Sequence, residues 1–384
     1  MKLNGLSEEF LEELAEQLNI SDAAFSSAER SYDAVSNLLQ KKFKNCKIHV
    51  YPQGSMRLGT AIKPINENDD YDLDLVCEFL GDYFTSAKDL KKSVGSALAE
   101  NEIYKKKLKE GKRCWKIEYA DSANFHMDIL PCKSSDKGDK SIDITNKVEN
   151  EYEYKSSNPY KYGLWFDILQ KNEIIRELKK RNIVLSEDCE IDDLKTYKIR
   201  TVLQKTIQIL KRHRDVTYLN ASEKELENKP ISIIITTIVG KMYTGSETIA
   251  DLIYKFITQI DKYLVVDSKG IYHVTNPVDE EENFADKWET HPSRKKAFFD
   301  WIYKLKKDLI LSSNLLSEDK IVRLEHLKKI FGASVISDIV KKEHFENKNK
   351  DKINYVKPNQ DNVVVFSKEQ DKNSLKVKEH TFYD

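Results

Sequence analysis

Three aspartates in two apolar segments are the residues of this sequence best suited to chemistry. Asp72 and Asp74 lie in YDLDLVCEF (71–79), and Asp128 lies in NFHMDILPC (124–132). Both segments alternate as half-buried β-strands do, so Asp72 and Asp74 project from the same face. Their carboxylates repel each other unless a cation lies between them, and oxygen ligands suit Mg²⁺. The spacing therefore predicts a divalent-metal site on this strand.

Asp128 is the third candidate ligand. An acid among apolar strand residues is costly unless it is solvated, hydrogen-bonded or bound to a cation. If the two strands are adjacent, three carboxylates complete a site for two Mg²⁺ ions, with Mn²⁺ as a substitute, which clamp the attacking and leaving oxygens of an in-line displacement. Asp70 has the same parity as Asp72 and stays an alternative partner, although the unbroken strand after Asp74 favours Asp72 with Asp74. His126 shares the face of Asp128, and we expect it to be a neighbour of the site.

A Gly54-Ser55 turn follows the strand-like segment KIHVYP (47–52). Such a turn offers backbone N–H groups, a hydroxyl and close approach, which suit a phosphate group. Gly-Ser turns are also common in ordinary loops, so this one gains meaning only from the acids downstream. Together they indicate transfer chemistry on a nucleoside triphosphate.

The elements that position these residues change in character along the chain. Helices are expected at 7–19, 24–44 and 86–100, and strands at 47–52, 71–80, 113–120 and 124–132. Beyond residue 160, helical periods dominate at 195–214, 230–243, 247–264, 293–312 and 318–341, with one strand-like patch at 262–274. We therefore predict an α+β protein with its active site in a cleft between two domains. The predicted parts are a catalytic domain with a mixed sheet and N-terminal helices (1–150), a helical domain (151–345) and a charged, mobile or loosely docked tail (346–384).

The composition excludes several classes of protein. The 384 residues include 63 Lys+Arg and 64 Asp+Glu, a net charge of −1, so stable nucleic-acid binding is not implied. The N-terminal segment is acidic, and no run approaches the roughly 20 apolar residues that cross a bilayer, which predicts a cytoplasmic protein without membrane contact. Five cysteines without a CxxC pair predict reduced thiols rather than disulfides or a zinc site.

These motifs together resemble the DNA polymerase β-like nucleotidyltransferases, and more narrowly the bacterial CD-NTases, relatives of cyclic GMP–AMP synthase and oligoadenylate synthetase. The resemblance covers most of residues 50–245. It rests on QGSMRLGTAIKP (53–64), YDLDLVCEF (71–79), HMDILPC (126–132), SNPYKYGLWF (157–166), LQKTIQILKRHRD (203–215) and PISIIITTIVGKMY (230–243). It implies a polymerase β-like core followed by an oligoadenylate-synthetase-like helical domain.

The resemblance also implies roles for single residues. Gln53, Gly54 and Ser55 would bind the donor triphosphate, Lys211 would contact its phosphates, and the three aspartates would be the metal ligands and catalytic residues. From the residues alone, the helix expected at 195–214 has an apolar stripe and a solvated side. That solvated side is expected to carry Lys205, Lys211, Arg212 and Arg214.

The activity that the resemblance implies is cyclic oligonucleotide synthesis from nucleoside triphosphates, ATP or GTP above all, with release of pyrophosphate. The product would be a second messenger in anti-phage defence, read by an effector protein, and ancillary regulators would act on the C-terminus. Two alternatives stay open. One is another template-independent nucleotidyltransferase that acts on RNA, protein or a small molecule, and the other is an inactive scaffold of the same fold.

Overall fold

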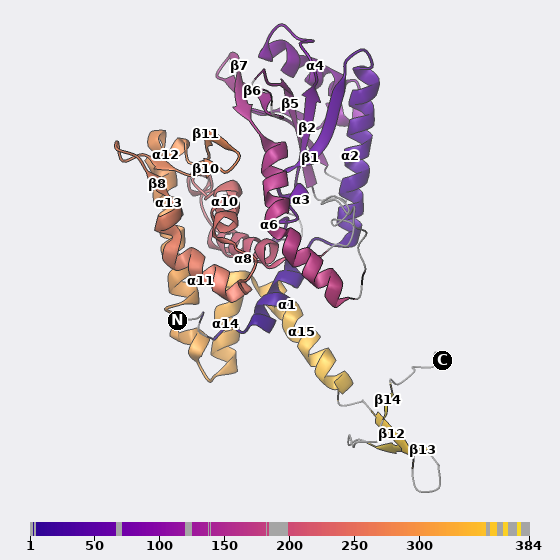
Figure 1. Cartoon of the computed structure of the whole chain (residues 1–384), viewed down its shortest axis with the longest axis vertical. Helices are drawn as coiled ribbons and strands as arrows, with labels where there is room; N and C mark the ends of the chain where they lie inside the picture. The colour runs from indigo at the N-terminus through magenta and orange to yellow at the C-terminus, as the bar shows by residue number, and fades with distance from the viewer. Residues whose placement is uncertain are drawn as a thin grey trace.

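A mixed β-sheet and a helical region lie one above the other in the computed structural model (Figure 1). Asp70 and Cys189 lie outside the described residues, so the structure does not address Asp70 as a metal ligand. The described residues are 3, 5–66, 71–119, 125–136, 138, 140–181, 183, 199–350, 354–358, 364–367 and 375–377.

The sheet has seven strands in the order β1-β2-β5-β4-β3, with β6 beside β5 and β7 beside β6. The central pair β2–β5 is parallel, and every other pair in the sheet is antiparallel. Strands occur at the four positions expected from the sequence. The bounds are β1 (Ile48–Gln53), β2 (Tyr71–Phe79), β3 (Leu108–Glu110), β4 (Trp115–Tyr119), β5 (Phe125–Ser134), β6 (Ile142–Val148) and β7 (Glu151–Ser157).

One face of the sheet is covered by helices α2 (Asp22–Lys42) and α4 (Ala87–Ala99). The odd-numbered side chains of β2 and β5 are buried against these helices, namely Leu73, Leu75, Cys77, Phe79, Phe125, Met127 and Ile129. Because side chains alternate along a strand, Asp72, Asp74 and Asp128 project from the opposite face. Short helices α3 (Gly54–Arg57) and α5 (Glu102–Lys105) complete this part of the chain.

The domain division differs from the predicted one at two places. The boundary predicted after residue 150 divides the β6–β7 hairpin, because Val148 pairs with Glu151 and the sheet continues to Ser157. Helix α1 (Glu8–Leu18), predicted to belong with the catalytic domain, buries its leucines in the core of the helical region. Both differences arise from contacts between separate segments of the chain. The pattern of residues within one segment does not reveal such contacts.

Helix α8 (Val202–Thr217) lies at the centre of the helical region, in contact with α1, α10, α11, α13 and α14. The single helix expected at 318–341 is two helices, because Gly332 with φ +98° ends the first. The bounds are α6 (Pro159–Lys180), α9 (Glu223–Leu226), α10 (Ser232–Met242), α11 (Ile249–Gln259), α12 (Lys287–Thr290), α13 (Pro292–Leu309), α14 (Lys320–Phe331) and α15 (Ala333–Lys350), with 3₁₀ turns at Ile260–Tyr263 and Ser313–Leu316.

Short strands join some of these helices and follow the last one. They are β8 (Val265–Val266), β9 (Tyr272–His273), β10 (Thr275–Asn276), β11 (Asp279–Asn283), β12 (Asn354–Pro358), β13 (Val364–Ser367) and β14 (Leu375–Val377). The last three form a sheet in the order β13-β12-β14 within the range predicted as a tail. Helix α15 continues past the boundary predicted at residue 345.

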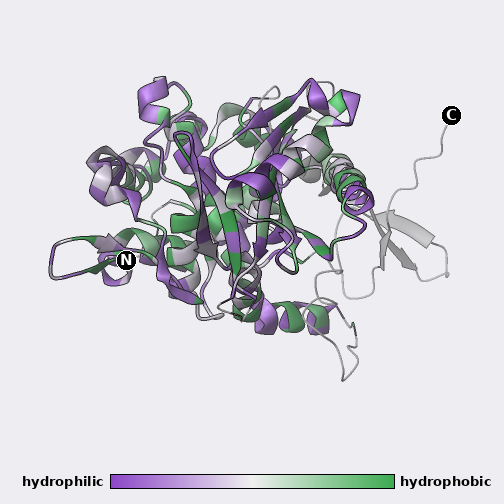
Figure 2. Ribbon diagram, turned by 90° about the horizontal axis from the view of Figure 1, so that it is seen from above, coloured by the Kyte–Doolittle hydropathy of each residue, from purple (hydrophilic) through white to green (hydrophobic). Residues whose placement is uncertain are grey.

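Hydrophilic stretches lie mainly toward the outside of the molecule when it is seen from above (Figure 2). Among the described helices, none is both long and apolar enough to cross a membrane. The four cysteines in the described ranges are free thiols, and Cys77 and Cys132 are buried in the sheet.

Candidate active site

The parallel pairing of β2 with β5 brings the acids of two distant motifs together. Asp74 lies beside Asp128 in the strand register, and Asp72 lies beside His126. Neighbouring strands are about 4.8 Å apart, so the carboxylates of Asp74 and Asp128 share one small part of the face. On the other side of β5, Lys116 has its Nζ 3.8 Å from Asp128 Oδ1. The predicted adjacency of the two acidic strands is confirmed.

Negative charge accumulates where these carboxylates meet. Burial, and then the charges of Asp72 and Asp128, raise the pKa of Asp74 to about 7. Asp128 Oδ1 is buried and accepts no hydrogen bond from the described residues. Leaving a buried acceptor unsatisfied costs about 1–3 kcal/mol. A divalent cation would satisfy this oxygen and relieve the repulsion, so Asp74 and Asp128 fit the Mg²⁺ site expected from the sequence.

Asp72 contacts a histidine of the neighbouring strand. Its Oδ1 lies 2.6 Å from His126 Nε2, and the hydrogen bond between them lowers the pKa of Asp72 and raises that of His126. In the described ranges, no three or more His, Cys, Asp or Glu side chains are grouped so that they could hold a metal ion. The expected three-carboxylate site is therefore not assembled in this structure. A cation shared by Asp72 and Asp74 would bind Oδ2 of Asp72 or would displace His126 from Oδ1.

The Gly54 turn lies against Asp74. Gly54 has φ +66°, and a Cβ built on it would lie 1.9 Å from Asp74 Oδ2, so no other residue allows this approach. Gly54 begins the short helix α3, and the first amides of a helix have no partner within it. Ser55, the next residue, lines the same cavity as Asp72 and Asp74. The turn therefore presents N–H groups and a hydroxyl beside the carboxylates.

Helix α8 holds the loop that connects this turn to β2. Its polar side chains donate hydrogen bonds to successive loop carbonyls: Gln204 to Leu58 (3.0 Å), Lys211 to Thr60 (2.9 Å), Gln208 to Ala61 (2.9 Å) and Arg212 to Lys63 (2.7 Å). The prediction that the basic residues of this helix lie on a solvated side is wrong for Lys211, Arg212 and Arg214, which are at most 6% exposed. Loop carbonyls and hydroxyls replace water as their partners.

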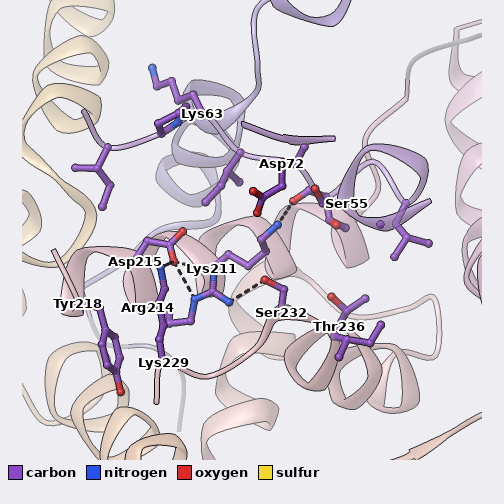
Figure 3. A pocket seen from close by; sticks show the side chains of 18 of the residues that line it. Ser55, Lys63, Asp72, Lys211, Arg214, Asp215, Tyr218, Lys229, Ser232 and Thr236 are labelled. Atoms are coloured by element: carbon purple, nitrogen blue, oxygen red, sulfur yellow. Dashed lines mark hydrogen bonds and ion pairs between the residues drawn. The ribbon is translucent and has the colours of Figure 1, made fainter. Parts of the chain in front are cut away.

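Lys211 lines the same cavity as Ser55 and Asp72. Its buried ammonium points toward Ser55 and Asp72 (Figure 3). Burial, and then the nearby Arg214, lower its pKa to about 8, while the charges of Asp72 and Asp74 act in the opposite direction. A cation held in this way gains from an anionic ligand in the cavity.

The cavity has a volume of about 590 Å³, and different groups of residues line its two ends. Ser55 and Asp72 lie at one end, Tyr218 and Lys229 lie at the other, and Lys211 lies between them (Figure 3). Most of the charged and aromatic residues beyond Lys211 come from the end of α8 and from the turn before α10, which the sequence patterns do not place at the cavity. The additional lining residues with polar side chains are Thr60, Lys63, Asn66, Arg214, Asp215, Tyr218, Lys229, Ser232 and Thr236.

Arg214 fastens the two segments that form the far wall. It donates to the Pro230 carbonyl at 3.0 Å and to Ser232 Oγ at 2.8 Å. Asp215 pairs with both Arg214 and Lys229 at 2.7 Å. In the sequence, the charged run RHRD at 212–215 is the feature that points to these contacts between the end of α8 and the turn before α10.

Gln53 lies on the other side of the Gly54 turn. It lines a neighbouring cavity of about 240 Å³, together with Gly54, Asp74 and Phe284, and is not among the residues that line the larger cavity. Its predicted contact with the donor triphosphate thus has no support in the shape of the larger cavity.

The sheet faces the helical region. This arrangement brings the acids of β2, the turn at Gly54 and the buried Lys211 to one cavity, with Asp128 of β5 beside Asp74. That convergence defines the class of the protein, a nucleotidyltransferase. Residues 5–172 match the family described as Second Messenger Oligonucleotide or Dinucleotide Synthetase domain. These residues form a domain of this family, and most of the chain is similar to curated cyclic dinucleotide synthases, which identifies it as a nucleotidyltransferase of second-messenger synthesis.

Two curated relatives and two solved structures support this assignment. The chain is 28% identical over 306 residues to a c-di-GMP synthase of Roseivirga ehrenbergii, covering 78% of this chain and 77% of the relative. It is 23% identical over 296 residues to the cyclic dinucleotide synthase CdnG of Bradyrhizobium diazoefficiens, covering 72% and 69%. The structure of that CdnG with GTP superposes with a TM-score of 0.65 at 21% identity, covering 88% of this chain and 99% of CdnG. CdnC of E. coli MS115-1 with ATP gives 0.62 at 12%, covering 86% and 99%, so the predicted fold is confirmed.

Proposed function

We propose that this enzyme joins two molecules of GTP into a cyclic dinucleotide and releases one pyrophosphate at each bond. The observation that carries the proposal is the order of groups along the larger cavity, with acids and Ser55 first, buried cations next and Tyr218 last. That order matches the order of metal, triphosphate and base in a bound nucleotide. GTP is the preferred substrate in this proposal because the relatives described above include a c-di-GMP synthase.

Asp74 and Asp128, together with Asp72, would hold two Mg²⁺ ions, or Mn²⁺ in their place. Ions at this position supply charge stabilisation for the attacking and leaving oxygens. The hydroxyl of Ser55 and the amides of its turn bind the outer phosphates of the donor.

The walls of the cavity bind the rest of the nucleotide. Lys211 and Arg214 balance the charge of the triphosphate, and hydrogen bonds to charged groups of this kind contribute about 1.5–3 kcal/mol each. Tyr218 stacks on the base, because its ring is half-buried and lines the far end of the cavity.

Each bond forms by the same exchange of groups. A ribose hydroxyl of the second nucleotide attacks the α-phosphorus of the first, the bond from that phosphorus to the bridging oxygen breaks, and pyrophosphate leaves with the electron pair. The hydroxyl proton passes to Asp128, whose buried Oδ1 accepts no other hydrogen bond from the described residues. A second exchange within the linear intermediate closes the ring.

The test is incubation of the purified protein with Mg²⁺ and each nucleoside triphosphate, singly and in pairs. GTP alone should yield a phosphatase-resistant product with the mass of two cyclised GMP units. A product made from other bases contradicts the choice of GTP, and a product that requires added RNA or protein favours the alternative transferase activity.

The catalytic assignment is tested separately by two variants. Asp74→Asn should lose at least a thousandfold in turnover, because Asp74 lies between the other carboxylates and cannot be replaced by a neutral ligand. Asp82→Asn is the matched control, because Asp82 is an exposed acid just beyond β2 that pairs with Lys133. Turnover of Asp74→Asn equal to that of the parent would overturn this assignment, and a parent without any turnover would favour the inactive-scaffold alternative.

The cellular role is part of the same proposal. The product would act in the cytoplasm as a second messenger of anti-phage defence, read by an effector, and a regulatory protein would act on the C-terminus. CdnC of E. coli MS115-1 has been solved in complex with HORMA-deltaN. Counting plaques on cells that carry the parent gene with its neighbours, or the same genes with Asp74→Asn, measures this role directly.

A further inference from the structure

A second cavity, of about 230 Å³, lies beside the active-site cleft and is rich in cations. We call it the basic pocket. Its cations come from the sheet, from the turn before α10 and from helices α12 and α13, and only Glu282 and Asp286 line it as acids. They are Arg113, Lys155, Lys229, Lys287 and Arg294.

Three of these cations make no ion pair with any residue that the structure describes. Lys155 pairs with Asp286 at 3.0 Å, and Lys229 pairs with Asp215 at 2.7 Å. Within the described ranges, the side chains of the other three, Arg113, Lys287 and Arg294, make neither an ion pair nor a hydrogen bond, although each is half-buried.

The three cations also act on one another. Burial, and then the charges of Arg113 and Arg294, lower the pKa of Lys287. Like charges gathered in a partly buried cavity destabilise one another unless an anion joins them. The cluster therefore has the character of a binding site for a strongly anionic group.

The basic pocket adjoins the site on the side of the carboxylates. It shares Ile233, Glu282 and Phe284 with the cavity of about 240 Å³ that Asp74 and Gly54 also line. A ligand that occupied both cavities would extend from the cations to Asp74.

The position of Arg113 gives a second link to the carboxylates. Arg113 lies two residues before β4, and Lys116 of β4 is opposite Asp128 in the strand register, with its Nζ 3.8 Å from Asp128 Oδ1. The residue that contributes the sheet-side cation of the basic pocket is therefore three positions along the chain from the neighbour of Asp128.

We propose that the basic pocket binds the 5′-triphosphate of the second nucleotide, the one whose ribose hydroxyl attacks. The inference rests on the proposed function and adds a binding site for that nucleotide. Its volume is below the roughly 300–1,000 Å³ of whole-ligand cavities, so it suits a phosphate chain better than a complete nucleotide. Its unpaired cations supply the charges that such a chain requires.

Single-bond kinetics test this proposal. The donor is 2′,3′-dideoxy-GTP, which has no attacking hydroxyl, and the second nucleotide is either guanosine 5′-(α,β-methylene)triphosphate, which cannot act as donor, or guanosine. The parent should prefer the triphosphate by at least tenfold in kcat/KM. In Lys287→Gln/Arg294→Gln this preference should fall at least tenfold, because two charge-assisted contacts are lost.

Two further variants control for damage to the fold. Lys296→Gln removes the same charge from α13 outside the pocket and should keep the preference. Arg113→Gln, on the sheet side, should reproduce the selective loss. An equal decrease for both acceptors in the double variant, or an unchanged preference, overturns the proposal and leaves the pocket to another anion such as an acidic protein segment.

Failure of the proposed function gives a different result. If the parent forms no bond with either acceptor, calorimetric titration of the methylene analogue into protein saturated with the dideoxy donor decides the pocket alone. Tighter binding to the parent than to Lys287→Gln/Arg294→Gln supports the triphosphate site, and equal binding overturns it.

Discussion

Replacing Gly54 by alanine tests whether contact between the Gly-Ser turn and Asp74 is required for catalysis. The added Cβ would lie 1.9 Å from Asp74 Oδ2, whereas real Cβ atoms are essentially never closer than 3.0 Å to such a neighbour. Either the turn or the carboxylate has to move by about 1 Å. Alanine at φ +66° also adds backbone strain.

The two effects have different sizes and different readouts. Left-handed backbone costs a non-glycine residue roughly 1–2 kcal/mol, which corresponds to a decrease in Tm of roughly 2–8 °C. A displacement of about 1 Å at a catalytic group lowers the rate by about a hundredfold. We therefore expect Gly54→Ala to lose about two orders of magnitude in turnover while it remains folded.

Gly270→Ala is the matched control. Gly270 has φ +77°, and its added Cβ would have no neighbour within 4 Å, so it carries the strain without the clash. Thermal melts and initial rates of pyrophosphate release are measured for both variants. The reasoning is refuted if Gly54→Ala keeps its turnover within threefold of the parent, or if Gly270→Ala loses activity to the same extent.

Three further predictions concern metal binding and stability. His126→Gln frees Asp72 from its ion pair and should lower the Mg²⁺ concentration for half-maximal rate by roughly two- to fivefold; an unchanged requirement would show that His126 does not compete for Asp72. EDTA should abolish turnover and added Mg²⁺ should restore it, whereas activity that survives chelation argues against the metal assignment. The buried His213 accepts a hydrogen bond from Trp301 Nε1 at its Nδ1, and its Nε2 lies 3.0 Å from Asp308 Oδ2. Burial lowers the pKa of this histidine below 6.5. Below pH 6.5 the unfolded chain therefore binds a proton that the folded chain does not, so stability should fall by up to about 1.4 kcal/mol per pH unit, and urea titrations of His213→Gln should show a flatter profile.

The alternation of apolar and polar residues within single segments was sufficient to predict that the acids of β2 and β5 share one face of the sheet. The buried residues Leu73 and Met127 and the acids beside them follow the period of two that a half-buried strand imposes. The prediction did not include Asp72 turning to His126, because that contact depends on the parallel register of two strands far apart in the sequence.

The opposite wall of the cavity could not be predicted in this way. Gln208 and Arg212 of α8 are polar side chains that require hydrogen-bond partners. The sequence does not show whether these partners are water molecules or, as in the structure, carbonyl groups of another segment. Tyr218 and Ser232 reach the cavity only because Arg214 joins the end of α8 to the turn before α10. The hairpin β6–β7 was missed because its outer strand is polar and has no fully buried residue.

The packing of α1 into the helical region has a consequence for the order in which the chain folds during synthesis. The buried leucines of α1, Leu11, Leu14 and Leu18, have α8 among their partners, and α8 begins only at Val202. At about 5–20 residues per second, the ribosome needs on the order of 10–40 s to make the intervening segment. During that time the sheet from β1 to β7 can complete its own core with α2 and α4, while α1 exposes an apolar stripe. The N-terminal helix therefore completes its packing later than the sheet that follows it in the sequence, and we expect the early chain to be a client for a chaperone that shields apolar helices.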